Sequence, residues 1–295
     1  MLRQLLRLHK NSPRCVIFFL AGCFPRTALV HMRQLSLFSM ICRLKPDNLL
    51  YQHAKNFFSA AVYFKESWFL QIRKLCLMYS LPHPSVLFHH PIPKEKFKSM
   101  MKKNVISYWE NILRQEASRL KSLTCFKTQF MSLIKPHPLW ETAGHNPIKV
   151  AMATVQALLL SGRYRCGQLT RHWSVGDGSC TMSSSCSGIL EDIPHIILWC
   201  PSLTRIRQGL YEYTLRYSSV LPLPLMVLIR SKFHPDNLNF IDCILDCSTD
   251  PQFITTTQVL GSDVLYHAFA VSRTWAYVLH RERLRLLGIW RPTSY

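Results

Sequence analysis

Three cysteines and one histidine with metal-ligand spacing are the residues of this chain best suited to chemistry: Cys180, Cys186, His195 and Cys200. They lie within 21 positions, in the pattern Cys-x5-Cys-x8-His-x4-Cys. Thiolate sulfur and imidazole nitrogen are preferred ligands of Zn²⁺, and four such ligands complete the tetrahedral shell of a closed structural site. The pattern therefore predicts one bound zinc ion. The competing interpretation is four ordinary buried residues, because cysteine is often buried as a small hydrophobe and the chain holds 11 cysteines and 13 histidines.

A loop and a short helix must position the four candidate ligands. Cys180 and Cys186 lie in a serine- and glycine-rich stretch that can wrap around an ion, and acidic residues and prolines indicate a short helix around the other two ligands. On an ideal helix, His195 and Cys200 would be offset by about 140° and separated by about 7.5 Å along the axis. One tetrahedral ion cannot bridge that separation, so we expect a distorted turn at Trp199–Cys200.

Arginine and aromatic residues are interleaved just before this cluster. The candidates for nucleic-acid contact there are Arg163, Tyr164, Arg165, Arg171 and Trp173. Arginine neutralises phosphates and aromatic rings stack on bases, although both rings would equally serve as packing beneath the zinc-binding module. A predicted helix at 94–120 adds Lys102 and Lys103, which lie mainly away from its apolar stripe. A lysine-rich helix face is usually only solvated, so these two residues gain weight from the other basic segments.

The sequence as a whole predicts a mainly α-helical protein, with helical lobes flanking a small Cys-Cys-His-Cys zinc-knuckle-like module. Ten glycines in 295 residues are about half the usual share, and no long run alternates strictly between apolar and polar residues. The predicted helices span 29–44, 67–79, 94–120 and 146–160, and helices resume from 202, with an apolar stripe over 264–279. The predicted regions are 1–139 (helical), 140–205 (helix plus zinc-knuckle-like module) and 206–295 (C-terminal helical).

Charge and cysteine usage narrow the class of partner. The 36 Lys and Arg against 16 Asp and Glu give a formal net charge of +20, which favours nucleic acid first and an anionic membrane second. The odd, scattered set of cysteines favours a reduced, intracellular protein, nuclear or cytoplasmic, over a disulfide scaffold. The apolar run Cys15–Phe24 follows a basic leader, as in a signal peptide, but about ten residues fall short of the roughly 20 that span a bilayer. We interpret this run as a buried core segment and expect no membrane partner.

Stretches on both sides of the candidate cluster share the residue patterns of one known family. They are Leu160–Arg165, Arg171–Ser174, Glu191–Pro201, Ser272–Trp275 and His280–Leu284, together with Arg33–Ile41 and Ser67–Arg73. These stretches resemble the C-terminal region of non-LTR (LINE-type) retrotransposon reverse transcriptases, and the resemblance covers the chain from about Ala21 onward. It implies a thumb-like and linker helical region, then a knuckle with Cys180, Cys186, His195 and Cys200 as ligands, then a helical tail. The first spacer of the knuckle is longer here than in the family pattern.

The carboxylate patterns of polymerases and nucleases are missing from the sequence. Polymerisation needs paired carboxylates that hold two Mg²⁺ ions, and the chain has no Asp-Asp pair. A nuclease motif starting at Asp236 would need a later lysine, and none follows Lys232. Asp242, Asp246 and Asp250 are therefore expected to cap turns. We expect that the chain is not an enzyme.

The predicted function is binding of RNA or DNA, largely independent of sequence, by a non-catalytic C-terminal fragment of a reverse transcriptase. One zinc ion would hold the knuckle in shape, and binding would weaken steeply with salt. The competing class is a structural or protein-interaction remnant, whose positive charge is inherited and has no present role with nucleic acid.

Overall fold

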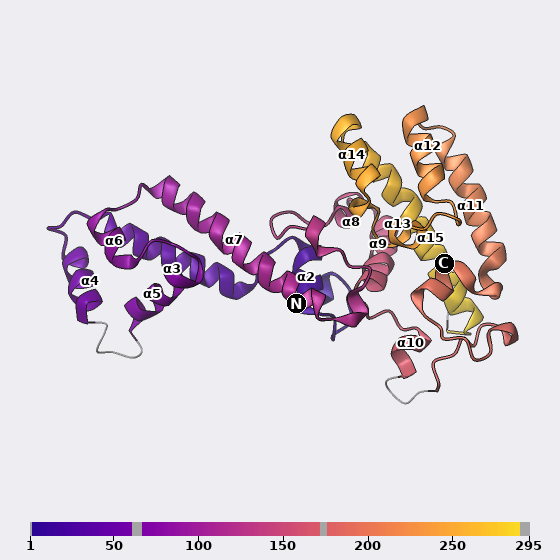
Figure 1. The fold of residues 1–295 in the computed structure, drawn as a ribbon, viewed down its shortest axis with the longest axis horizontal. Coiled ribbons are helices and arrows are strands. Elements are labelled where there is room, and N and C mark those ends of the chain that lie inside the picture. Colours follow the sequence, from indigo (N-terminus) through magenta and orange to yellow (C-terminus); the bar gives the residue numbers. More distant parts are fainter. Residues whose placement is uncertain (1, 61–66, 172–175, 290–295) are drawn as a thin grey trace. The chain divides into compact units, whose positions relative to one another are not determined.

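The computed structural model describes residues 2–60, 67–171 and 176–289 (Figure 1). Over these residues the secondary structure is helical, apart from one isolated β-bridge between Ser179 and Leu190. The mainly α-helical fold is therefore confirmed. The α-helices are α1 Leu2–Leu5, α2 Arg14–Ala21, α3 Arg26–Cys42, α4 Leu49–Ala60, α5 Trp68–Met78, α6 Pro84–His89, α7 Lys94–Ser118, α8 Pro138–Glu141, α9 Pro147–Leu160, α10 Gly167–Thr170, α11 Thr204–Ser218, α12 Leu223–Lys232, α13 Phe240–Asp246, α14 Pro251–Leu260 and α15 Asp263–Leu286.

The chain forms two compact units. The smaller unit is Cys23–Glu116, and the larger unit combines Met1–Gly22 with Ala117–Tyr295. These limits differ from the predicted boundaries at residues 139 and 205. The reason lies in α15, which packs against α9, α11, α13 and α14, so the predicted central and C-terminal regions share one core.

An aromatic cluster forms the centre of the smaller unit. Phe38 on α3 is fully buried, and its ring meets Trp68, Phe69 and Phe88 edge-on at centroid distances of 6.3, 6.5 and 5.3 Å. Ser67 accepts a hydrogen bond from the backbone N–H of Phe69 and caps α5, which begins directly after it, as the helix predicted over 67–79 requires. The stripe predicted for the helix at 94–120 also faces this core, because Phe97, Met101 and Val105 of α7 are buried there.

The long helix α15 is the centre of the larger unit. Its predicted apolar stripe is buried, including Trp275, whose indole N–H donates to Thr214 Oγ1 at 2.9 Å. On the side of α9, the buried amide of Gln156 donates to the backbone carbonyls of Ile244 and Leu245 at 2.7 and 3.0 Å. Asn146 caps α9, the helix predicted over 146–160, by accepting from the N–H groups of Ile148 and Lys149.

The apolar run near the N-terminus is helix α2, packed within the larger unit. Cys15, Val16 and Leu20 are fully buried, as expected for a core segment. The left-handed Gly22 ends the helix where a Cβ atom would lie 2.1 Å from the carbonyl oxygen of Lys135, so only glycine fits. Of the helices in the described ranges, none alone has both the length and the apolar character to cross a membrane; α2 and α3 reach those thresholds only when they are counted together.

Candidate metal centre

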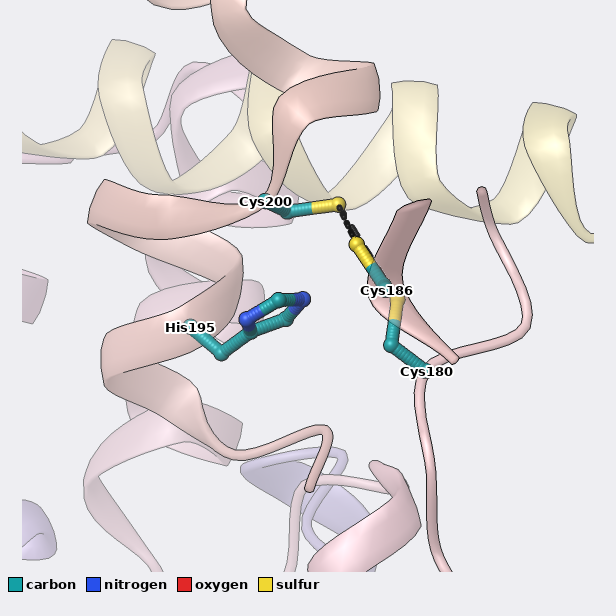
Figure 2. Close-up of side chains that lie close together, drawn as sticks. All are labelled: Cys180, Cys186, His195 and Cys200. Atoms are coloured by element: carbon teal, nitrogen blue, oxygen red, sulfur yellow. Dashed lines mark hydrogen bonds between the residues drawn. The ribbon is translucent and has the colours of Figure 1, made fainter. Parts of the chain in front are cut away.

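The four candidate ligands meet at one point in the larger unit, as Figure 2 shows. Their ligand atoms all lie within 4.8 Å of one another. The Cys200 sulfur is 4.0 Å from the sulfurs of Cys180 and Cys186. All four side chains are buried, with exposed fractions of 3% or less. Ligands at about 2.3 Å from a tetrahedral ion would lie about 3.8 Å apart, so this cluster can hold a metal ion with little rearrangement.

The two loop cysteines are fixed by a short hairpin-like segment. The Cys180 N–H donates to Ile189 O at 2.8 Å, and the Ile189 N–H donates to Cys186 O at 2.9 Å. The bridge between Ser179 and Leu190 closes the base of this loop. Backbone hydrogen bonds therefore hold the two sulfurs on one side of the cluster, where Figure 2 shows them facing the other two ligands.

The distortion expected at the end of the short helix is present, and it extends over five residues. His195–Trp199 form one π-helical turn, in which the Cys200 N–H donates to His195 O at 2.7 Å. A turn closed between residues five apart brings them to the same side, which an α-helical turn does not do. Asp192 fixes the start of the turn by accepting from the His195 N–H at 2.7 Å. The wide turn thus brings His195 and Cys200 to one side, although the same spacing on an ideal α-helix would keep them too far apart for one ion.

One atom of the cluster has no partner. His195 Nε2 is buried, and no hydrogen-bond partner reaches it. Leaving a buried polar nitrogen without a partner is costly, whereas a neutral imidazole nitrogen is a good metal ligand. The orphaned nitrogen and three adjacent sulfurs are the donor set that a metal ion would complete.

Burial sets the protonation state of the thiols. It raises the pKa of the Cys180 thiol to about 12, with the neighbouring Cys200 and Cys186 sulfurs acting in the same direction. Burial also raises the pKa of the Cys186 thiol. Without a cation both thiols hold their protons, so binding of a metal ion must release protons.

A buried ion pair connects the cluster segment to α15. Arg283 donates from Nε and Nη2 to the two carboxylate oxygens of Glu191, each at 2.8 Å. The same carboxylate accepts from the Gly167 N–H at 2.7 Å. Gly167 approaches Gly178 so closely that an added Cβ would lie 2.1 Å from the Gly178 carbonyl oxygen. The loop before the cluster and the loop within it are thereby held together.

The sequence pattern does not predict this ion pair. Glu191 belongs to the acidic residues that indicated the short helix, and Arg283 follows the predicted apolar stripe. The two residues are 92 positions apart, so no local pattern links them.

The predicted nucleic-acid contacts have different surroundings. Arg165 and Arg171 are exposed on the larger unit, Arg163 is half-buried there, and Lys102 and Lys103 are exposed on α7 of the smaller unit. Tyr164 is only 6% exposed, and the Arg283 guanidinium lies 5.3 Å from its ring centre. The buried position of Tyr164 thus favours a packing role over stacking on a base at an open surface. Trp173 lies outside the described residues.

The aspartates considered for a nuclease take part in ion pairs and caps. Asp242 forms an ion pair with Lys127 at 2.7 Å, and Asp250 with Lys232 at 2.6 Å. Asp246 Oδ2 lies within hydrogen-bond distance of His137 Nε2, at 3.1 Å. Asp246 and Asp250 also accept hydrogen bonds from backbone N–H groups at the starts of the following helical turns, so the prediction that they cap turns is confirmed. For Asp242 it is wrong, because this residue lies within the first turn of α13 and is not its N-cap.

Comparisons of the chain with protein-family models, with curated proteins and with solved structures find no match.

Proposed function

We propose that this protein binds RNA or DNA, largely independently of sequence, as the non-catalytic C-terminal part of a LINE-type reverse transcriptase. One observation carries the proposal: a buried Cys3His set lies inside a chain with a formal net charge of +20. A metal-stapled module with a large excess of positive charge is typical of proteins that work beside nucleic acid.

Zinc is the metal that best suits the donor set. Three sulfurs and one imidazole nitrogen are soft or borderline ligands, which select zinc over the oxygen-binding ions Mg²⁺ and Ca²⁺. All four positions would be filled by protein atoms, so the ion would be structural and would leave no site for substrate or water. Its role would be to hold the segment 176–200 in shape beside the basic loop that contains Arg163 and Arg165.

Exposed cations without acidic partners supply the phosphate contacts on each unit. No ion pair involves Lys102, Lys103, Arg165 or Arg171 within the parts of the chain that the structure describes. An exposed, unpaired cation can neutralise a phosphate and release a condensed counterion without first breaking a salt bridge. Such contacts do not read the base sequence, so affinity should depend on salt far more than on sequence.

A salt titration tests the proposal. The zinc-loaded full chain is titrated with fluorescent single-stranded RNA, and in parallel with anionic phosphatidylserine vesicles, between about 0.05 and 0.2 M salt. We expect tighter binding to RNA than to vesicles. The double variants Lys102→Gln/Lys103→Gln and Arg165→Gln/Arg171→Gln should each lower the salt slope by about 0.7 for every phosphate contact that they remove.

Matched controls separate specific contacts from loss of charge. Lys45 and Lys55 are exposed in the smaller unit, and Lys45→Gln/Lys55→Gln removes the same charge as the variant on α7. It should leave the salt slope unchanged. RNA binding no tighter than vesicle binding at moderate salt would refute the proposal and leave a structural or protein-interaction role. The proposed origin from a LINE-type reverse transcriptase is tested separately. Genomic sequence upstream of this reading frame should encode the palm motifs of a polymerase.

A further inference from the structure

A cavity of about 570 Å³ lies in the larger unit, away from the metal ligands. Three segments line it: the loop at Arg7–His9, the end of α9 with the following loop (Leu158 and 163–165), and the last turns of α15 with Ile289. This volume is in the range of pockets that bind small molecules. The candidate metal ligands and the exposed Lys102 and Lys103 do not line it, so the cavity requires its own explanation.

Arginine dominates the charge of the cavity. Arg7, Arg163, Arg165 and Arg283 line it, and no carboxylate does. Arg283 is neutralised by Glu191, but no ion pair to Arg7, Arg163 or Arg165 occurs among the described residues. Arg163 Nε is buried without a hydrogen-bond partner. Because an unpaired buried N–H of a cation is costly, a bound anion would relieve this arrangement.

The pKa of His9, which lines the cavity, responds to the same positive charges. Burial lowers the pKa of His9, and the charges of Arg165, Arg163 and Lys10 lower it further. His9 is therefore predominantly neutral at pH 7, and the positive charge in the cavity comes from the arginines.

The rest of the cavity wall is mainly apolar, and a hydrogen bond fixes one of its side chains. Leu8 is buried, and Leu158, Leu284 and Ile289 complete an apolar lining. Tyr164 forms part of the wall, and its hydroxyl shares a hydrogen bond with His280 Nδ1 at 2.8 Å. A bare inorganic anion would use the arginines but leave this apolar surface empty. The lining suits a ligand with an anionic group at one end and a flat, weakly polar body at the other.

We propose that this cavity binds a nucleotide with a terminal phosphate, which pairs with Arg7, Arg163 and Arg165 while the base lies against Leu158 and Leu284. The inference rests on the proposed function and extends it, since Arg163 and Arg165 already belong to the proposed nucleic-acid surface. Arg7 is the new contact. The nucleotide is either the phosphorylated end of a strand or a free mononucleotide, and the two have the same recognition chemistry.

Calorimetric titration of the zinc-loaded full chain with adenosine 5′-monophosphate tests the inference. We expect one saturable site, with adenosine and inorganic phosphate each binding at least about tenfold more weakly, because each lacks one half of the ligand. Arg7→Gln should weaken binding of the monophosphate about tenfold. Leu284→Trp should weaken it at least as much, by filling the cavity. Arg205→Gln, which removes an exposed arginine from α11, is the matched control and should change affinity by less than about twofold.

Several results would overturn the inference. They are no saturable binding of the monophosphate, adenosine or phosphate binding equally well, or full affinity in a folded Arg7→Gln variant. Arg7 is exposed in a loop, so circular dichroism should show that this variant folds normally. A 5′-phosphorylated RNA oligonucleotide that displaces the monophosphate, while its unphosphorylated twin does not, assigns the site to strand ends; no displacement by either assigns it to free nucleotides.

The same titrations distinguish this inference from the proposed function. If long RNA binds with the expected salt slope and the monophosphate does not bind, only the cavity inference fails. If the monophosphate binds and RNA binds no tighter than vesicles, the proposed function fails, and the cavity is a site for free nucleotides.

Discussion

Phe38 in the smaller unit and His195 in the larger unit are both buried, but their surroundings differ in kind. The Phe38 ring packs against other aromatic rings, with Phe88 at a centroid distance of 5.3 Å. His195 lies beside three thiols, and its Nε2 atom has no hydrogen-bond partner. The first environment is satisfied by apolar packing alone, whereas the second contains a buried nitrogen that no protein atom satisfies.

The difference shows where each region obtains its stability. Around Phe38, helices α3, α5 and α6 bury apolar surface, the dominant favourable term in folding. The segment 176–200 has only short helical turns and one isolated bridge. In small modules with so little regular structure, a metal ion commonly supplies part of the stabilising free energy.

Removing the metal should have the largest effect. Cys200→Ser takes away the sulfur that lies 4.0 Å from both other sulfurs. We expect the zinc content to fall from one ion per chain to none, with loss of a binding free energy of about 10–16 kcal/mol. Hydrogen exchange over 176–200 should become fast, while exchange over 26–42 in the smaller unit stays slow. Metal analysis and exchange mass spectrometry measure the two effects.

A cysteine outside the cluster provides the control. Cys125 is half-buried in the larger unit and lies apart from the four ligands, so Cys125→Ser should keep one zinc ion and slow exchange over 176–200. A Cys200→Ser protein that still bound one zinc ion and kept this segment protected would show that Cys200 is not a ligand.

Truncating the aromatic core should have the second largest effect, and this effect should be confined to the smaller unit. Phe38→Ala should lower the free energy of unfolding of the smaller unit by about 3–5 kcal/mol, because it leaves a cavity among three rings. Zinc content should stay at one ion per chain. Leu37 is the neighbouring residue on α3 and 47% exposed, so Leu37→Ala should cost no more than about 0.5 kcal/mol. A loss of zinc in Phe38→Ala would mean that the metal site depends on the smaller unit.

Much of the helical fold was predictable because its signals are local. Ser67 and Asn146 each cap the helix that follows within three residues, and the stripe over 264–279 repeats at helical spacing. The division into units was not predictable in the same way. It depends on α15 meeting α9, more than 100 positions earlier in the chain, and no local pattern encodes that contact.

The residues of the candidate metal site were predictable, but the contacts that hold them in place were not. Ligand types and spacing were sufficient to identify Cys180, Cys186, His195 and Cys200, and even to require a distorted turn. The ion pair between Glu191 and Arg283 was not predictable, because charged residues are normally exposed. Only the tertiary structure shows that this pair is buried. The arginine-lined cavity was not predictable either, because Arg7 and Arg283 come from opposite ends of the chain.

A hydrogen bond between a histidine and a tyrosine occurs in each unit, which allows a finer comparison. His31 Nδ1 lies 2.7 Å from the Tyr79 hydroxyl in the smaller unit, and His280 Nδ1 lies 2.8 Å from the Tyr164 hydroxyl in the larger unit. Burial lowers the pKa of both histidines. Only at His280 does a neighbouring cation, Arg283, add to the effect, and the pKa falls to about 4.

Acid should therefore destabilise the larger unit through His280, with the smallest of the three effects. Above pH 6.5 the ring is neutral in both the folded and the unfolded chain, so its contribution to stability is fully present. As the pH falls from 6.5 towards about 4, the unfolded chain binds a proton that the folded chain does not, and up to about 3 kcal/mol is lost. Release of the proposed metal ion would also weaken this unit in acid. The comparison is therefore with His280→Asn, which keeps a hydrogen-bond acceptor near Tyr164 but does not titrate. Denaturant unfolding between pH 7 and pH 4.5, followed by exchange in α15, should show a shallower decline in the variant. Equal slopes in the two proteins would mean that His280 is protonated in the folded state, and that its burial beside Arg283 does not exclude the charge.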